Sequence, residues 1–191
     1  MRLLLVSEKK IGAVGNIQMN PGNGLVDHAG VFFDLEGMPT HAHKNRKRPP
    51  MGAFRERNAI TAACLLMHKA VFEKMGGFCE DYRNGMEDID LCVRLRIAGY
   101  TLVVSHESII LHHVSQSPGR HENNDANSAV FKKRWAVTTA VWGENEWAIE
   151  YLRRYARFWW KFDPGLMVKA VIIVVTRSLT GVRKGDGFND S

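Results

Sequence analysis

The chain has few cysteines, and their spacing matches none of the common cysteine-based sites. Cys64, Cys79 and Cys92 form neither a Cys-x-x-Cys pair nor a Cys/His set with metal-ligand spacing. Three scattered thiols, an odd number, do not make the disulfide framework of a small secreted protein. The sequence therefore predicts reduced thiols in or near the core of a cytosolic protein.

Long apolar runs are lacking as well. The best candidate, residues 166–175, is interrupted by Lys169, and its ten residues fall short of the roughly 20 that cross a bilayer. Residues 1–6 are too few for the apolar region of a signal peptide, and Glu8-Lys9-Lys10 follows them directly. We therefore expect a cytoplasmic protein, or one bound peripherally to the cytoplasmic face of the membrane.

What the chain does contain is typical of a soluble globular protein. Its 191 residues are 45% hydrophobic and 24% charged, which is enough for one domain with its own core. The net charge of +6 favours an anionic partner, such as a nucleotide diphosphate, a lipid phosphate, a membrane surface or nucleic acid. Charge alone does not choose among these partners.

The pattern of apolar residues predicts an α/β fold. We expect strands at residues 11–19, 26–34, 59–67, 101–105 and 108–111, and helices at residues 68–75, 87–98, 126–135, 144–160 and 166–179, with a helix tail at residues 2–7. The helix at residues 87–98 is the clearest, because its apolar residues share one face and Gly99 ends it.

Three acids, Glu87, Asp88 and Asp90, stand within four residues at the start of that helix. The positive end of the helix dipole favours their ionised form, and a carboxylate held in this way can accept a proton from a hydroxyl group. On spacing alone, capping and solubilising the helix is the more common role of such acids.

Several segments resemble, in the same order, the second half of the catalytic domain of family 2 glycosyltransferases, which are inverting sugar transferases of the GT-A type. The resemblance covers roughly residues 11 to 135. The matching residues are Ala63-Cys64-Leu65-Leu66-Met67 with Val71-Phe72, Gly76-Gly77-Phe78, Glu87-Asp88-Ile89-Asp90-Leu91-Cys92 with Arg94, Ala98-Gly99-Tyr100, His112-His113-Val114-Ser115-Gln116-Ser117, and Phe131 with Arg134-Trp135.

The resemblance implies a fold and a reaction. It implies that residues 1–135 form the acceptor-side portion of a Rossmann-like GT-A sheet with flanking helices, and that residues 136–191 form a helical extension. In the resembling enzymes a Glu-Asp pair at this position serves the acceptor, which makes Asp88 the general base and Glu87 its neighbour in acceptor binding. Asp88 would deprotonate an acceptor hydroxyl, which attacks the anomeric carbon of a nucleotide-sugar donor and inverts it as the nucleotide diphosphate leaves.

Asp88-Ile89-Asp90 also spells D-x-D, the pattern with which glycosyltransferases hold a divalent metal, Mn²⁺ or Mg²⁺. In the family this motif ends a strand upstream of the segment that matches Ile11, and that position would fall before Met1. The resemblance therefore implies that the donor half, with its nucleotide-binding strands and metal acids, is missing. We expect Asp90 to be structural and the chain to hold no complete metal site.

The resemblance also assigns residues downstream of the acids. It places His112, together with Ser115 and Ser117, near the donor diphosphate or the metal, and imidazole is a competent ligand for Mn²⁺-like metals. From the residues alone, a buried and hydrogen-bonded histidine is the simpler interpretation. Gly76, Gly77, Glu87 and Trp135 form the predicted acceptor-binding set. Phe131 replaces the Gln or Arg of the processive [Gln/Arg]-x-x-Arg-Trp motif, so a structural tryptophan is the simpler alternative and polymerisation is not expected.

Two basic segments remain. Residues 44–50 are interpreted as a solvated loop or one that closes over phosphate. Nucleic-acid binding is not expected there, because aromatic interleaving and helix-turn-helix or zinc spacing are lacking. Residues 151–162 mix arginines with aromatics and, with the apolar residues 166–175, predict a helix at a membrane surface or one packed on the protein. A sheet without its first strands would expose an edge, so self-association is also expected.

Three functions follow from these observations. The first is an inverting glycosyltransferase, or the truncated part of one, that uses a nucleotide sugar and a glycan or lipid-linked acceptor in cell-surface polysaccharide biosynthesis. The second is a non-catalytic module of the same fold that recognises a glycan or a partner. The third is a basic membrane- or nucleic-acid-associated protein without sugar chemistry. The order of the motifs favours the first two.

Overall fold

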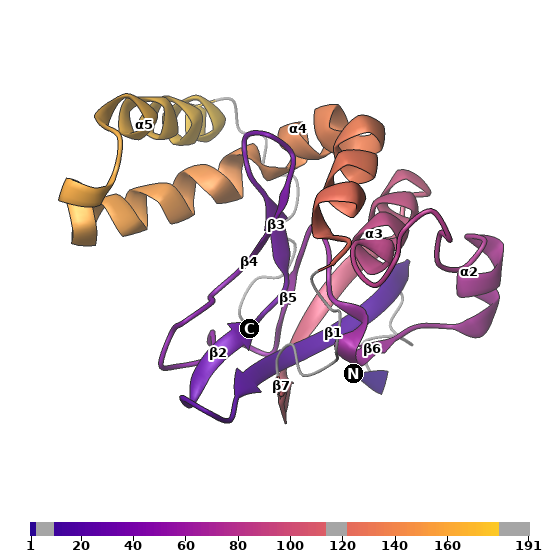
Figure 1. The fold of residues 1–191 in the computed structure, drawn as a ribbon. Helices are drawn as coiled ribbons and strands as arrows, with labels where there is room; N and C mark the ends of the chain where they lie inside the picture. The colour runs from indigo at the N-terminus through magenta and orange to yellow at the C-terminus, as the bar shows by residue number, and fades with distance from the viewer. Residues whose placement is uncertain (3–9, 114–121, 180–191) are drawn as a thin grey trace.

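The computed structural model describes residues 1–2, 10–113 and 122–179, which form the mixed α/β structure that the sequence predicts (Figure 1). The strands are β1 (Ile11–Asn20), β2 (Leu25–His28), β3 (Val31–Phe33), β4 (Pro39–His41), β5 (Phe54–Glu56), β6 (Leu65–Leu66) and β7 (Thr101–Leu111). The helices are η1 (Ala62–Cys64), α2 (Lys69–Lys74), α3 (Glu87–Ile97), α4 (Asn124–Phe158), η2 (Trp159–Lys161) and α5 (Pro164–Leu179). Ser115, Ser117 and most of the predicted helix tail lie outside the described residues.

The main sheet is built around β1 and β7, its two longest strands. They run parallel, and the order β2-β1-β7-β5 is completed by antiparallel strands, with β6 pairing β1 as well. A second, two-stranded sheet joins β3 to β4. The first part of β1 is buried on both faces, as expected of a strand between layers.

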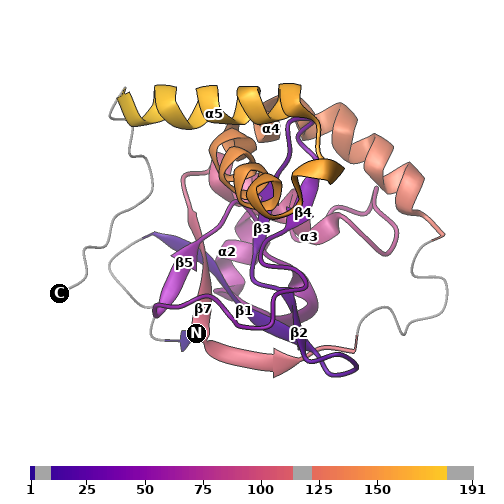
Figure 2. The ribbon, with the colours of Figure 1, turned by 90° about the vertical axis from the view of Figure 1, so that its left-hand side faces the viewer.

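One hydrophobic core joins the sheet to the helices. Ile17 of β1 and Val104 of β7 pack against Leu91 of α3 and Phe131 of α4, all fully buried. The Phe131 ring stacks on Phe33 of β3, with 6.2 Å between ring centroids. Helix α5 packs along α4 on the side away from the sheet (Figure 2). The core therefore ends at α4, and α5 forms an outer layer.

Four predicted strands differ from those observed. The predicted strand 26–34 is divided into β2 and β3 at Gly30, whose φ of +95° turns the chain from one sheet to the other. The predicted strand 59–67 is reduced to Leu65–Leu66, because side chains and not a neighbouring strand hold Ala62 and Ala63. The two predicted strands at 101–111 are one strand, β7, whose register with β1 shifts beside Asn16.

The two helices predicted at 126–135 and 144–160 are one helix, α4, which runs through the proposed boundary at residue 135. Thr139, in the middle of the predicted gap, donates its hydroxyl to the carbonyl of Gly37 at 2.7 Å. At Gly143 a Cβ would collide with the carbonyl oxygen of Phe33. The glycine therefore serves a close approach between α4 and β3 and does not break the helix.

Candidate functional site

Helix α3 begins in a strained turn that carries the three acids. Met86, at the N-cap, has φ 74°, a left-handed conformation that is uncommon for residues with side chains. Glu87 accepts the backbone N–H of Gly85 at 2.6 Å through Oε2. Strained positions of this kind cluster at functional sites, and this makes the start of α3 a candidate functional site.

The carboxylate of Asp88 is held by two backbone N–H groups from different segments. Its Oδ1 accepts the N–H of Ile89 at 2.8 Å, and its Oδ2 accepts the N–H of Ala62 at 2.9 Å. Burial raises the pKa of Asp88, and the negative charge of Glu87 raises it further. The residue is nevertheless part-exposed. Asp88 is thus a fixed carboxylate with increased proton affinity that an outside group can reach.

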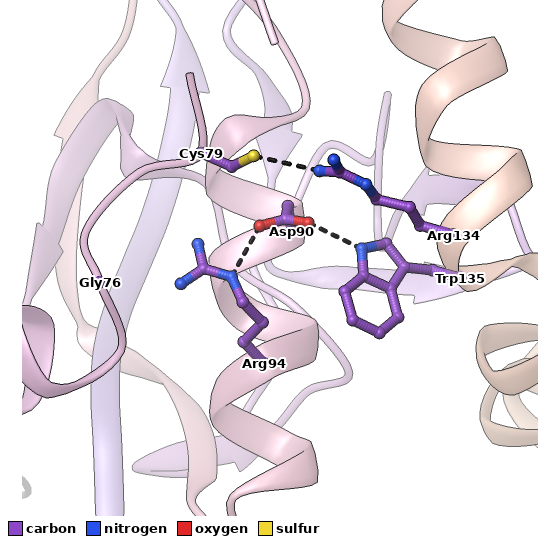
Figure 3. Close-up of a pocket in the computed structure, with 6 residues that line it drawn as sticks. All are labelled: Gly76, Cys79, Asp90, Arg94, Arg134 and Trp135. Carbon is purple, nitrogen blue, oxygen red and sulfur yellow. Dashed lines mark hydrogen bonds and ion pairs between the residues drawn. The ribbon is translucent and has the colours of Figure 1, made fainter. Parts of the chain in front are cut away.

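Asp90 is arranged differently, although it stands only two residues further along (Figure 3). Its side chain is 2% exposed, and Oδ2 accepts Nε of Arg94 at 2.7 Å. Oδ1 accepts the indole N–H of Trp135 at 2.7 Å and, more distantly, the hydroxyl of Tyr82. The two acids of the D-x-D pattern therefore bond to different parts of the chain, and Asp90 connects α3 to α4.

A pocket of about 470 Å³ opens beside Asp90. Its lining residues come from the loop after α2, from α3 and from α4, and they are Gly76, Cys79, Asp90, Arg94, Arg134 and Trp135 (Figure 3). The structure thus brings together Gly76 and Trp135, two members of the predicted acceptor-binding set. Gly77 lies next to this pocket, and its carbonyl accepts Nη2 of Arg94 at 2.7 Å. Glu87 and Asp88 lie outside the lining, three and two residues before Asp90 on the same helix.

A group of histidines that the sequence analysis did not single out lies on the other side of Ala62. Thr61 donates its backbone N–H to Nε2 of His28, whose Nδ1 is 3.2 Å from Nδ1 of His41. Burial, followed by the neighbouring His41, lowers the pKa of His28 well below its usual value. Burial also lowers the pKa of His41. Both rings are therefore neutral at pH 7, and one donates to the other.

His112 lies at the end of β7 and belongs to the same polar region. Its Nδ1 is 3.3 Å from Oδ2 of Asp27, and its backbone N–H donates to Met19. Asp27 is buried and also faces Lys44, at 3.7 Å. His113 is exposed. The sequence signal for Asp27 and His28 was weak, because they are only two consecutive polar residues within the strand predicted at 26–34.

The divalent metal implied by the resemblance finds only a partial ligand set. Among residues 10–113 and 122–179, no group of three or more His, Cys, Asp or Glu side chains is arranged to hold a metal ion. His112 and Asp27 contribute an imidazole and a carboxylate, which is fewer than the ligand sets of common metal sites. The described residues therefore do not fit a complete metal centre, and no chemical step is derived through one.

Two ion pairs connect the basic segment 44–50 and the nearby Arg57 to α4. Arg57, which is buried, forms an ion pair with Glu146 and donates Nε to the carbonyl of Ala29 at 2.9 Å. Arg46 pairs with Glu150 at 3.1 Å. Within segment 44–50, Arg46 and Lys47 are both exposed, and the charge of Arg46 is paired at the surface with Glu150.

The remaining predictions concern cysteines and membrane spans. Cys64, Cys79 and Cys92 are all free thiols, and burial raises the pKa of Cys92 to about 12. Within the part of the chain that the structure describes, no helix is both long and apolar enough to span a bilayer.

Comparison with known proteins provides a family-level context. A search of protein families finds no match for the chain. It is 31% identical over 151 residues, or 75% of its length, to an uncharacterized protein of Sinorhizobium fredii, y4gI. It is 30% identical over 115 residues, or 56% of its length, to the O-antigen biosynthesis protein RfbC of Myxococcus xanthus. Over 61 residues, or 32% of its length, it is 41% identical to the N-acetylglucosaminyl-diphospho-decaprenol L-rhamnosyltransferase of Mycobacterium tuberculosis.

The chain spans only a small part of each of these relatives, namely 16%, 9% and 20% of their lengths. Identity is modest, but two relatives of different organisms carry related names, one for O-antigen biosynthesis and one for rhamnosyl transfer. Together these similarities indicate a glycosyltransferase-like family for this chain.

Proposed function

We propose that this chain is the acceptor-side part of an inverting, family 2 glycosyltransferase of the GT-A type, with Asp88 as the general base. The observation that carries the proposal is the setting of Asp88. Its carboxylate is fixed by the N–H groups of Ala62 and Ile89, its pKa is raised by burial, and it stays part-exposed. A general base works best when its position is fixed and its pKa lies closer to the working pH.

The proposed reaction is a single in-line displacement. Asp88 takes the proton of an acceptor hydroxyl while that oxygen forms a bond to the anomeric carbon of a nucleotide sugar. The bond from this carbon to the diphosphate breaks on the opposite face, so the nucleotide diphosphate leaves with the electron pair and the configuration inverts. Proximity and orientation of the reacting groups supply much of the rate enhancement.

The pocket beside Asp90 is the proposed place for the acceptor. Trp135 offers an apolar surface on which a sugar ring can pack, and the bond from its indole N–H to Asp90 fixes its orientation. The rhamnosyltransferase relative carries the name of an acceptor in which a sugar is linked through diphosphate to decaprenol. We therefore propose a glycan or lipid-linked sugar as acceptor, and a nucleotide sugar as donor.

The substitution Asp88→Asn tests the base. In the full-length protein it should lower turnover by about 10²- to 10⁴-fold, because an amide cannot take the proton. Binding of the nucleotide sugar should change little. The assay measures release of nucleotide diphosphate from a panel of nucleotide sugars in the presence of a lipid-linked acceptor.

Asp125→Asn is the matched control, because Asp125 is an exposed acid in the first turn of α4. Full activity of the Asp88→Asn protein would remove the assignment. If no donor supports turnover, but a glycan binds saturably and Trp135→Ala abolishes that binding, the chain is a non-catalytic glycan-binding module.

Glu87→Gln probes the same site through pH. The charge of Glu87 raises the pKa of Asp88, so its removal should lower that pKa. The acid limb of the kcat/KM profile should then move to lower pH, by up to about one unit. An unchanged limb, or a shift to higher pH, would mean that Asp88 is not the group that titrates.

A further inference from the structure

The end of the described chain carries an exposed apolar surface, which we call the C-terminal surface. It comprises Trp159 and Trp160 of η2 and the outward residues Val168, Ile172, Val175 and Leu179 of α5. Trp159 and Trp160 are 64% and 61% exposed, and Ile172 and Leu179 are 55% and 81% exposed. Several large apolar side chains exposed within one short segment indicate a binding surface.

The outward stripe of α5 follows from its sequence. Val168, Ile172, Val175 and Leu179 recur at i, i+4, i+7 and i+11, so they share one face of the helix. Ala170, which is fully buried, marks the opposite face, which packs on α4. Helix α5 is thus apolar on both sides, and among the described residues only the side that packs on α4 is covered.

Charge distinguishes this surface from an ordinary protein contact. Within residues 151–179 there are six basic side chains and one acid, namely Arg153, Arg154, Arg157, Lys161, Lys169 and Arg177, against Asp163. Asp163 accepts the backbone N–H of Leu166 at 2.9 Å, so it caps α5. Arg153 and Arg177 also form ion pairs with Glu150 and Glu144 of α4. Arg154, Arg157, Lys161 and Lys169 therefore supply the positive charge in the segment that carries the exposed tryptophans and the apolar stripe of α5.

The turn that presents the tryptophans is held by aromatic packing. Tyr151 donates its hydroxyl to the carbonyl of Asp163 at 2.9 Å, and its ring meets that of Phe162 edge-on at 5.2 Å. Trp147 packs on the other side of Tyr151, with 5.1 Å between ring centroids. The position of η2 relative to α4 is therefore set before any partner binds.

We propose that the C-terminal surface docks onto the headgroup region of an anionic lipid bilayer. Indole rings and basic side chains both favour this region, and apolar stripes enter the acyl boundary. A second copy is a poorer occupant, because a symmetric contact would bring two strongly basic segments together. An anionic bilayer relieves that repulsion and covers the apolar stripe at once. The inference is independent of sugar transfer, since it uses none of the residues proposed for it.

The test is flotation of the full chain with phosphatidylcholine vesicles and with phosphatidylcholine–phosphatidylglycerol vesicles. The protein should float with the anionic vesicles, much less with the neutral ones, and less as salt is raised, because screening weakens the attraction. Flotation with neither kind of vesicle would overturn the proposal. Equal, salt-independent flotation with both kinds of vesicle would show that the docking does not depend on anionic headgroups, which contradicts the proposal as stated.

The double variant Trp159→Ala/Trp160→Ala should weaken partitioning into anionic vesicles by at least about tenfold, because the buried indole area is lost. The matched control is Val137→Ala/Val141→Ala, which trims two exposed apolar residues of α4 outside the C-terminal surface and should float like the parent. Equal flotation of the tryptophan variant would overturn the proposal. If that variant instead converts a stable dimer into a monomer, measured by light scattering, a second copy is the occupant.

Discussion

The start of α3 and the C-terminal surface differ in how their side chains are satisfied. At the start of α3, each acid bonds to a group of the same chain, and Asp90 is nearly inaccessible to water. On the C-terminal surface, large apolar side chains face outward among basic residues. The difference shows that the fold fixes the polar groups of the first region through bonds within the chain, whereas it leaves the apolar groups of the second region exposed.

The strongest way to break this comparison is to replace Asp90. The substitution Asp90→Asn should lower the free energy of unfolding by about 3 kcal/mol, because it leaves Arg94 without its buried partner and presents an amide donor to it. Urea denaturation of the parent and the variant measures this difference.

Asp81→Asn is the control for Asp90, because Asp81 forms an ion pair with Arg134 on the surface and is 60% exposed. It should change stability by less than about 0.5 kcal/mol. If both substitutions cost the same, Asp90 does not connect α3 to α4 in the way described.

A second prediction concerns the neutral histidines beside the α3 site. Burial holds the pKa of His28 well below its usual value, and that of His41 is also lowered. In the unfolded chain a histidine gains a proton below about pH 6.5, whereas the folded protein keeps these two neutral. The free energy of unfolding should therefore fall as pH drops from about 6.5 toward their folded pKa values, by up to about 1.4 kcal/mol per unit for each histidine.

Urea denaturation at several pH values measures this slope. His28→Gln should remove the part of this pH dependence that His28 contributes. His68→Gln, at an exposed position before α2, serves as its control. A slope that is the same in the parent and in His28→Gln would show that His28 takes up its proton in the folded state.

The smallest expected effect sharpens the other half of the comparison. Ile172→Ser should change stability by no more than about 0.5 kcal/mol, because its side chain is 55% exposed. Thermal unfolding without lipid measures this. A loss above about 1 kcal/mol would mean that Ile172 is packed within the protein, and the C-terminal surface would then be smaller than described.

Local patterns predicted the elements nearest the candidate site well. The helix at 87–98 was recognisable because its apolar residues repeat at helical spacing and a glycine follows them. In the structure Gly99 takes a φ of +78°, which a glycine adopts easily at a helix end. Gly76 and Gly77 likewise end α2 with positive φ values. These features depend only on neighbours in the sequence, and so a sequence is sufficient to find them.

Features that depend on distant contacts were not predictable in this way. The β-branched residues at 137–139 and Gly143 have low helix propensity, yet α4 continues through them because Thr139 bonds to Gly37 and Gly143 approaches Phe33 closely. The pairing of His28 with His41 across β2 and β4 arises from the fold. The sequence could name Asp88 and Trp135, but it could not place Asp90 between Arg94 and Trp135.

The unbroken length of α4 has a geometric consequence. Trp135 and Trp159 are separated by 24 residues of one continuous helix and its end, a path of about 36 Å along the helix at 1.5 Å per residue. Helix α4 changes direction along its length (Figures 1 and 2), so the direct distance is shorter, but the continuous helix still holds the pocket and the C-terminal surface in a fixed relative orientation. If that surface docks on a bilayer, α4 sets the distance between the bilayer and the pocket. That distance determines whether the pocket can contact the sugar of a lipid-linked acceptor.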